Sequence, residues 1–226
     1  MDLNKINEFL KTIDLKSYRK KYSHIKIVEM DLSKDIQAIQ LLYEVYWDER
    51  SFLSFDDFYK RYLKEKKGSI EKFKKKTTMC NDCFDRGLKA RIYRTWASII
   101  TQIHAGYVAE SVFGKGTVFM SEKLDHKGVD IQVKYRENIL NYQVKKTTHS
   151  GVISRKPLSR KPNEGESIDI KYEIPACLSD PKTKKGEFRV PYLRFLNDKR
   201  TTSFENGFVI FTPYVFLVKK EEIDKN

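Results

Sequence analysis

The sequence contains few cysteines and no long apolar run, and these two features argue against a disulfide-rich secreted domain and against a membrane-spanning protein. Three cysteines among 226 residues are too few for the disulfide framework of a small secreted domain. No run approaches the roughly 18 apolar residues of a membrane-spanning helix, so we expect no membrane partner. The opening stretch MDLNKINEFLKTIDL has mixed charge and lacks the apolar core of a signal peptide. We therefore expect a cytoplasmic location.

Positive charge dominates the composition. Lys and Arg total 44 against 31 Asp and Glu, which gives a formal net charge of +13 and a pI near 9.4. Such a surplus opposes compaction and indicates a polyanionic partner, with nucleic acid the first candidate because phosphate neutralisation dominates its affinity. The alternative is a charge that serves only solubility in a Lys-rich chain. The hydrophobic share of 40% is enough for a sizeable core.

The first part of the chain predicts helices. Apolar residues recur at helical spacing in an opening helix and in a second helix that Ser33 is expected to cap. The two stripes are Ile6, Phe9, Leu10 and Ile13, and then Ile36, Ile39, Leu42, Tyr43 and Tyr46. Ser54 precedes a third helix, and the basic stretch 64–76 follows. A solvated helical face is the favoured interpretation of this stretch, and a contact to the DNA backbone is the alternative. The longest helix is expected over 89–112.

From residue 117 onward the pattern is that of strands. Apolar residues alternate with polar ones, or run together, over several short segments. These are 117–120, 128–135, 140–146, 168–174 and 207–211. The last, GFVIF, predicts a compact apolar strand that could lie at the centre of the sheet, and 147–166 predicts a polar loop. Helices followed by a clustered sheet predict one α/β (α+β) domain over 1–226, with a helical part over 1–88 and a core over 89–226.

Two of these strands place reactive side chains on one face. Alternation in GVDIQV (128–133) sets Asp130 opposite the apolar residues, and alternation in YQVKK (142–146) does the same for Gln143 and Lys145. If the strands pair, an acid, an amide and a lysine converge over an apolar floor. That arrangement suits a divalent cation, an activated water and a phosphodiester. The competing interpretation of Asp130 is an exposed polar strand residue.

The residue types indicate how a cation would be held. Mg²⁺ binds hard oxygen atoms, usually one or two carboxylates together with several waters. The expected ligand set is Asp130, Gln143, the Val144 carbonyl and, as further carboxylates, Asp125 and Glu110. Lys145 would orient or activate the attacking water and offset developing charge.

An acid followed downstream by acid-x-Lys is the PD-(D/E)xK nuclease pattern, which the chain resembles in Asp130 and Gln143-Val144-Lys145. The chain departs from the pattern at Gln143, because an amide stands where the pattern has an acid. Either the metal is held more loosely, or Glu110 or Asp125 supplies the missing charge.

A more specific resemblance runs from near the N-terminus to about residue 149. The segments that carry it are IDLKSY (13–18), KY (21–22), IVE (27–29), YRTW (93–96), TQIHAGY (101–107) and LDHKGVD (124–130). Through them the chain resembles the TaqI-type restriction endonucleases. The resemblance implies a restriction-endonuclease-like mixed β-sheet flanked by helices. It also implies a Mg²⁺-dependent type II endonuclease that acts on double-stranded DNA at the palindrome TCGA.

The functional set of that family is two aspartates five residues apart and a downstream lysine. Through the resemblance it corresponds to Asp125, Asp130 and the pair Lys145-Lys146. Strand alternation favours Lys145 over Lys146. A palindrome has two-fold symmetry, so a homodimer is the simplest assembly, and a restriction system implies a cognate DNA methyltransferase.

Base reading is expected from the basic stretch that leaves the second strand. Its candidates are Lys146, His149, Arg155, Lys156, Arg160 and Lys161. A solvated loop is the alternative for each of them. Two other functions stay open: a structure-specific DNA repair nuclease with the same core, and a catalytically inactive DNA-binding protein, for which Gln143 is the argument.

Two further motifs have a functional interpretation that the sequence does not favour. Cys80 and Cys83 form a CxxC, but a structural zinc site needs four ligands, no second pair follows at finger spacing, and Cys177 would have to join by tertiary proximity. His104 lies among apolar residues of the long helix, so we expect a packing role rather than a general base.

Overall fold

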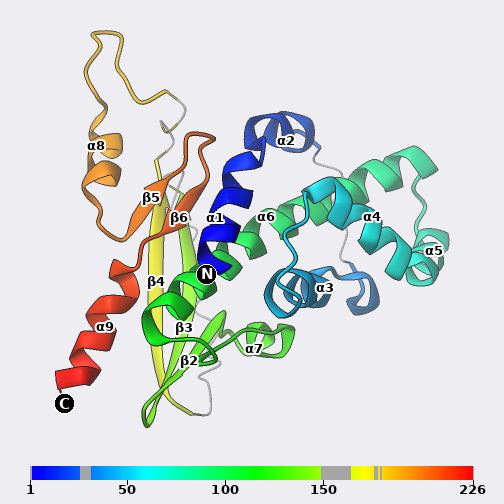
Figure 1. Ribbon diagram of the computed structural model, residues 1–226. Coiled ribbons are helices and arrows are strands. Elements are labelled where there is room, and N and C mark those ends of the chain that lie inside the picture. Colours follow the sequence, from blue (N-terminus) through cyan, green and yellow to red (C-terminus); the bar gives the residue numbers. More distant parts are fainter. Residues whose placement is uncertain (1, 26–31, 149–163, 176–177, 179, 226) are drawn as a thin grey trace. The chain divides into compact units, whose positions relative to one another are not determined.

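The computed structural model describes residues 2–25, 32–148, 164–175, 178 and 180–225. The chain divides into two compact units (Figure 1). One, the helical unit, comprises residues 12–100, and the other, the sheet unit, joins residues 1–11 to 101–226. The single domain over 1–226 stays a prediction.

Short helices build the helical unit around an aromatic core. They are α2 (Leu15–Tyr22), η1 (Lys34–Ile36), α3 (Ile39–Tyr43), η2 (Glu44–Asp48), α4 (Phe55–Glu65), α5 (Lys67–Lys76) and the first part of α6 (Asn81–Phe113). Rings from α2, α4 and α6 contact one another with centroids 5.0–6.3 Å apart. These rings belong to Tyr18, Tyr22, Phe55, Tyr93 and Trp96. Such contacts add to the stabilisation that burial of the rings already provides.

The caps predicted for two helices have different outcomes. Ser54 Oγ accepts the Asp57 N–H at 3.2 Å, so α4 begins where the sequence indicates. Ser33 makes no side-chain cap bond, and the prediction of a single second helix is wrong, because the extended backbone of Gln37 separates η1 from α3. Most of the apolar stripe is nevertheless buried, since the successive 3-10, α and π turns still direct it inward.

The sheet unit holds a mixed four-stranded sheet and the helices around it. Its strands are β1 (Val118–Phe119), β2 (Ile131–Tyr135), β3 (Asn138–Thr148) and β4 (Glu166–Ile174), in that order across the sheet, with β5 (Thr201–Ser203) and β6 (Val209–Phe211) as a separate pair. Its helices are α1 (Asp2–Thr12), α7 (Glu122–His126), α8 (Val190–Asn197), α9 (Tyr214–Lys225) and the end of α6. β1, β2 and β3 pair antiparallel and β4 lies parallel to β3, which confirms the predicted mixed sheet.

One face of the sheet is buried under the end of α6 and under α9 (Figure 1). Ile131 of β2 pairs with Tyr142 of β3, and both are fully buried. The Tyr142 ring meets Phe216 of α9 edge-on at 5.1 Å, and Phe113 of α6 contacts Phe216 and Tyr135. Because side chains alternate along a strand, this packing turns the polar residues of β2 and β3 to the other face.

Two predictions for the strands need correction. The segment 207–211 does not form a central strand, because β6 pairs with β5 in a two-stranded sheet of the described chain. The residues of β6 are nevertheless buried. A continuous apolar run therefore predicts that a strand is buried, but not where it lies within a sheet. The predicted loop 147–166 is too long, since β3 runs to Thr148 and β4 begins at Glu166.

The long helix α6 is longer than predicted. It begins at Asn81 rather than near residue 89 and ends at Phe113, where Gly114 follows with a φ of +109° that favours glycine. Within the described ranges, none of the helices combines the length and the apolar character needed to cross a membrane.

Candidate active site

A short helix and a glycine turn bring two aspartates together at the start of β2. Ser121 caps α7 by accepting the Leu124 N–H at 3.3 Å. Gly128 follows at a φ of +78°, and its N–H donates to the Asp125 carbonyl at 2.8 Å. A residue with a side chain is strained in this conformation, which explains the glycine. The turn allows the Asp125 side chain to hydrogen-bond with Asp130, five residues further on.

Asp130 is a buried acid, with only 7% of its surface exposed. Its Oδ2 accepts the Val144 N–H at 2.6 Å, and its own N–H donates to the Tyr142 carbonyl at 3.0 Å, which ties it to β3. Burial, with a smaller contribution from Asp125, raises the pKa of its carboxyl to about 7, although the Val144 N–H and Lys145 both act to lower that pKa. The interpretation of Asp130 as an exposed strand residue is therefore wrong.

The two carboxyl groups form a donor set for a divalent cation. Two acids in contact repel each other when both are ionised, and a cation between them offsets both this repulsion and the cost of burial. Their oxygens are the hard ligands that Mg²⁺ takes in proteins. Asp125 and Asp130 therefore fit the metal that the sequence implies.

Glu110 is the more distant member of the predicted ligand set. It lies half-buried on α6. No three His, Cys, Asp or Glu side chains among the described residues come together as a metal cluster, so Glu110 does not form one group with Asp125 and Asp130. Its role as a ligand stays a prediction.

Gln143 and Lys145 lie on β3, and β4 supplies a carboxylate beside them. In the parallel register, Gln143 pairs with Asp169. The Lys145 Nζ lies 2.5 Å from Asp169 Oδ2, and both side chains are partly exposed. The Gln143 amide nitrogen lies beside the glycine turn, 3.7 Å from the position that a Cβ on Gly128 would occupy. The structure thus brings Asp125, Asp130, Gln143 and Lys145 to one end of the β2–β3 pair.

Asp169 is the residue that the sequence reasoning missed. Alternation in IDIKYEI assigns it to the polar side of its strand. Which strand lies next to it, and in which register, depends on a parallel pairing between segments that no local pattern reveals.

The base-reading prediction lies almost wholly outside the described residues. For Lys146 the structure describes the backbone alone, within β3 and paired with Tyr172. The remaining candidates, all outside the described ranges, are His149, Arg155, Lys156, Arg160 and Lys161. Their contribution to DNA binding stays a prediction.

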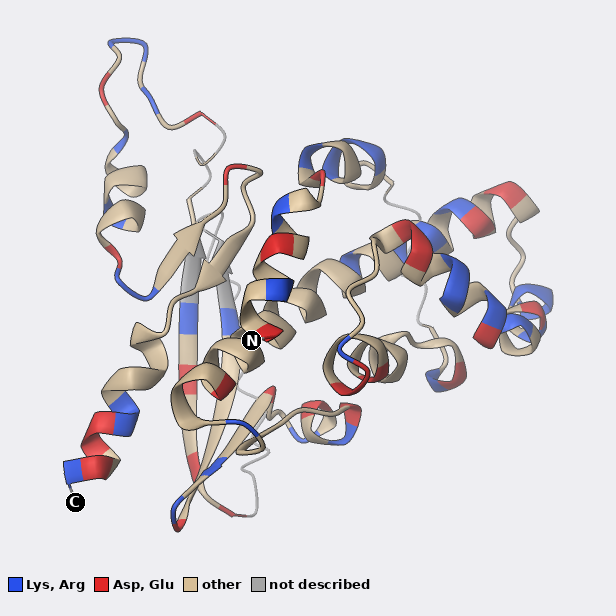
Figure 2. Cartoon of the chain, in the orientation of Figure 1, with Lys and Arg blue, Asp and Glu red and all other residues tan. Residues whose placement is uncertain are grey.

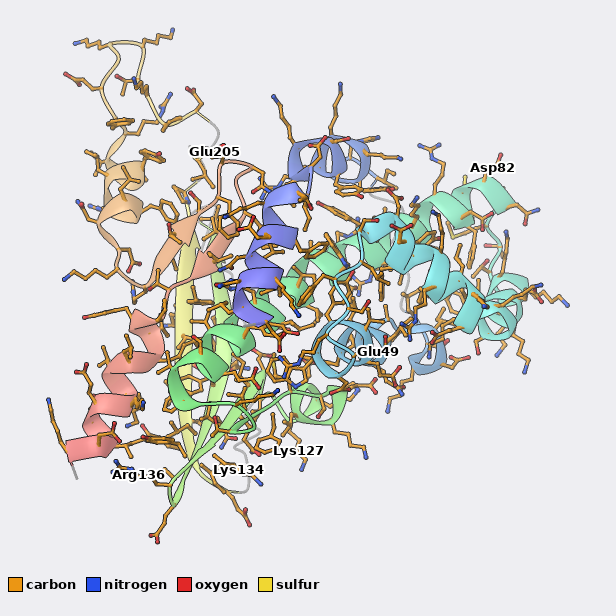
Figure 3. All side chains as sticks on the ribbon, viewed as in Figure 1. Glu49, Asp82, Lys127, Lys134, Arg136 and Glu205 are labelled. Carbon is orange, nitrogen blue, oxygen red and sulfur yellow. The ribbon has the colours of Figure 1, made fainter. Side chains whose placement is uncertain are left out.

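Described basic side chains have different environments. Arg136 binds Asp224 of α9 at 2.7 Å, and Lys134 lies over the Phe119 ring at 5.2 Å, whereas Lys127 is exposed directly after α7 (Figure 3). Figure 2 shows a further concentration of basic residues along α2 of the helical unit. Its exposed members are Lys16, Arg19, Lys20 and Lys21.

The CxxC and the helical histidine have partners outside the group of Asp125, Asp130, Gln143 and Lys145. Cys80 and Cys83 are both exposed, the Cys83 N–H donates to Cys80 Sγ at 3.2 Å, and Cys177 lies outside the described residues. His104 is 1% exposed, with its Nε2 2.8 Å from Asn7 Oδ1. Burial lowers its pKa to about 3, so the ring is a neutral packing group, as the sequence indicates.

Comparison with known proteins shows which family the chain is similar to. The family model for TaqI restriction endonuclease matches residues 3–221. The chain is 32% identical over 220 residues to the type II restriction enzyme TaqI of Thermus aquaticus, and 28% identical over 225 residues to the type II restriction enzyme TthHB8I of Thermus thermophilus. Each match covers 92% of this chain and 83% of the relative. No solved structure matches the chain.

Proposed function

The chain belongs to the TaqI restriction endonuclease family, and we propose that this type II restriction endonuclease cleaves double-stranded DNA at the palindrome TCGA with Mg²⁺ as its cofactor. Family membership confirms the prediction of a site-specific deoxyribonuclease. The resemblance of segments such as LDHKGVD (124–130) to the family supports the target sequence. The donor set at the start of β2 supports the metal.

The contact between Asp125 and Asp130 is the observation that carries the metal-dependent reaction. These side chains would hold the ion, and the Val144 N–H fixes the orientation of the Asp130 carboxylate toward it. When bound, Mg²⁺ offsets negative charge on the phosphate and lowers the pKa of its bound water. The buried position of Asp130 keeps bulk water from competing for its oxygens.

Lys145 is the residue that we assign to the attacking water. Its ammonium group donates hydrogen bonds that orient the water, and its charge offsets the charge that develops on the phosphate. The Gln143 amide oxygen and the Val144 carbonyl complete the proposed donor set, with Glu110 as a further carboxylate. Because Gln143 is neutral, it binds a cation less strongly than an acid at this position would.

The partners follow from the same proposal. A two-fold symmetric target is cut most simply by a homodimer that presents one site to each strand. A cognate DNA methyltransferase would protect the host's own TCGA sites, and the cytoplasm is the compartment where this DNA is met. The basic residues 146–161 and the exposed lysines of α2 are the proposed contacts to DNA.

An end-mapped plasmid digest tests the function. Purified protein with Mg²⁺ should yield discrete fragments whose ends map to TCGA, and methylated plasmid should stay intact. Asp130→Ala should abolish cleavage while circular dichroism shows the fold retained. Preference for branched substrates would favour a repair nuclease instead, and salt-sensitive binding without cleavage under any divalent metal would favour an inactive DNA-binding protein.

A further inference from the structure

Asp169 gives the sheet a second carboxylate on the face that carries Lys145. The register pairs it with Gln143, and paired residues of neighbouring strands direct their side chains to the same face. Its Oδ2 lies 2.5 Å from the Lys145 Nζ, which is a charge-assisted contact. Asp169 belongs neither to the nuclease pattern nor to the pair of aspartates at the start of β2.

The neighbours of Lys145 explain why it needs such a partner. A lysine side chain has a flexible four-carbon stem and adopts many rotamers when nothing holds it. Lys171 is its partner in the β3–β4 register and repels it, while Gln143 is neutral and cannot attract it. Asp130, which Lys145 influences electrostatically, lies on the side of β2. Asp169 draws the ammonium from the opposite side.

We propose that Asp169 is a positioning residue that holds the Lys145 ammonium where the attacking water and the phosphate meet. The inference rests on the proposed endonuclease reaction and adds a residue of β4 to it. Asp169 acts through Lys145 and does not itself coordinate the metal.

The ion pair between Asp169 and Lys145 contributes little to the fold. The two side chains are 46% and 38% exposed, and exposed ion pairs add little net stability. Asp169→Asn should therefore fold as the wild type does. Glu166 offers a matched control, because it lies on the same strand and binds Lys219 of α9 at 2.9 Å without touching Lys145.

The first experiment needs neither metal nor DNA. Free protein is treated briefly with acetic anhydride, and acetylation of each lysine is measured by peptide mass spectrometry. An ion-paired ammonium is shielded from acylation. Lys145 should therefore be acetylated about threefold faster or more in Asp169→Asn than in the wild type. Glu166→Gln should leave the Lys145 rate unchanged. Equal Lys145 rates in wild type and Asp169→Asn would show that the contact does not hold the side chain.

The second experiment measures single-turnover cleavage at saturating Mg²⁺. Loss of a partner that orients a reactive group typically lowers activity by about 10–100-fold, and we expect the cleavage rate of Asp169→Asn to fall by that factor. Asp169→Glu should recover part of the rate, and Glu166→Gln should cleave normally. Affinity for DNA, measured with Ca²⁺ in place of Mg²⁺, should change by less than about twofold.

A double-mutant cycle separates positioning from other roles. In a Lys145→Ala background, Asp169→Asn should have no further effect, because its effect passes through Lys145. Additive losses, a full rescue by raised Mg²⁺, or an undiminished rate in Asp169→Asn would each overturn the inference. Failure of the wild type to cleave DNA would instead refute the proposed function, and the acetylation result would still report on the ion pair.

Discussion

Replacing Asp130 by Asn should make the protein more stable and remove its activity. Asn has nearly the same shape, and its carbonyl oxygen can still accept the Val144 N–H that Asp130 accepts at 2.6 Å. Its amide group can donate to the Asp125 carboxylate, where the wild type sets two acids against each other. The substitution thus removes a buried charge and a repulsion while it keeps the local hydrogen bond.

The size of the gain follows from the pKa of the Asp130 carboxyl, which burial and, to a smaller extent, Asp125 raise from 3.8 to about 7. The unfolded chain releases this proton above pH 3.8, whereas the folded chain retains it until about pH 7. The cost to the folded state is absent below the lower value, grows between the two, and is complete above the higher. At about 1.4 kcal/mol per pKa unit it reaches about 4 kcal/mol, an upper bound for the gain of Asp130→Asn near pH 8 without metal.

Urea unfolding followed by circular dichroism, in EDTA at pH 8 and at pH 4, measures the effect. We expect the free energy of unfolding of Asp130→Asn to exceed that of the wild type by about 2–4 kcal/mol at pH 8, and this difference to shrink toward zero at pH 4. Mg²⁺ at a hundred times its dissociation constant should stabilise the wild type by about 2.7 kcal/mol, and Asp130→Asn by much less. A variant less stable than the wild type in EDTA at pH 8 would refute the reasoning, because the carboxylate would then not be an electrostatic cost.

Three further substitutions test other parts of the structure. Since burial lowers the pKa of His104 from 6.5 to about 3, the contribution of His104 to the free energy of unfolding should fall by about 2 kcal/mol between pH 7.5 and 5, as the unfolded state takes up the proton; in urea unfolding the difference between the wild type and His104→Gln should change by this amount, and a difference that does not vary with pH would contradict it. Gly128→Ala should lower the free energy of unfolding by about 1–2 kcal/mol, because Gly128 has a φ of +78°. It should also slow cleavage by disturbing the turn that aligns Asp125. A variant with the same thermal unfolding midpoint as the wild type would contradict this. Ser54→Ala removes the cap on the Asp57 N–H and should lower stability by about 1 kcal/mol in the same unfolding assay, with single-turnover cleavage unchanged.

Much of the site was predictable because it depends on local patterns. Period-two alternation assigned Asp130, Gln143 and Lys145 to the polar sides of two strands, and β2 and β3 pair as that alternation requires. The pairing of Asp125 with Asp130 was implied by the family resemblance rather than by alternation, and in the structure the two carboxyl groups interact. The roles of these residues in cleavage stay predictions.

The failures share a cause, which is competition from tertiary packing. Ser33 has a favourable cap residue type, but the chain at Gln37 is extended, so the apolar residues on either side enter the core from separate turns. GFVIF (207–211) is as apolar as a central strand, but burial within the sheet unit accounts for that character without a central position. Propensity and hydrophobicity limit what a segment can form, and its neighbours decide among the remaining choices.

The sequence by itself determined the charge of the protein, the polar and apolar sides of its strands, the acid, amide and lysine chemistry of the site, and the family. Each of these depends on residue type or on spacing along a few turns of chain. The tertiary structure decided how deeply Asp130 is buried, and therefore why the pKa of its carboxyl is raised to about 7. It also decided that Asp169 lies beside Gln143 and binds Lys145. Burial and parallel register both arise from contacts between residues distant in sequence, and no local pattern encodes them.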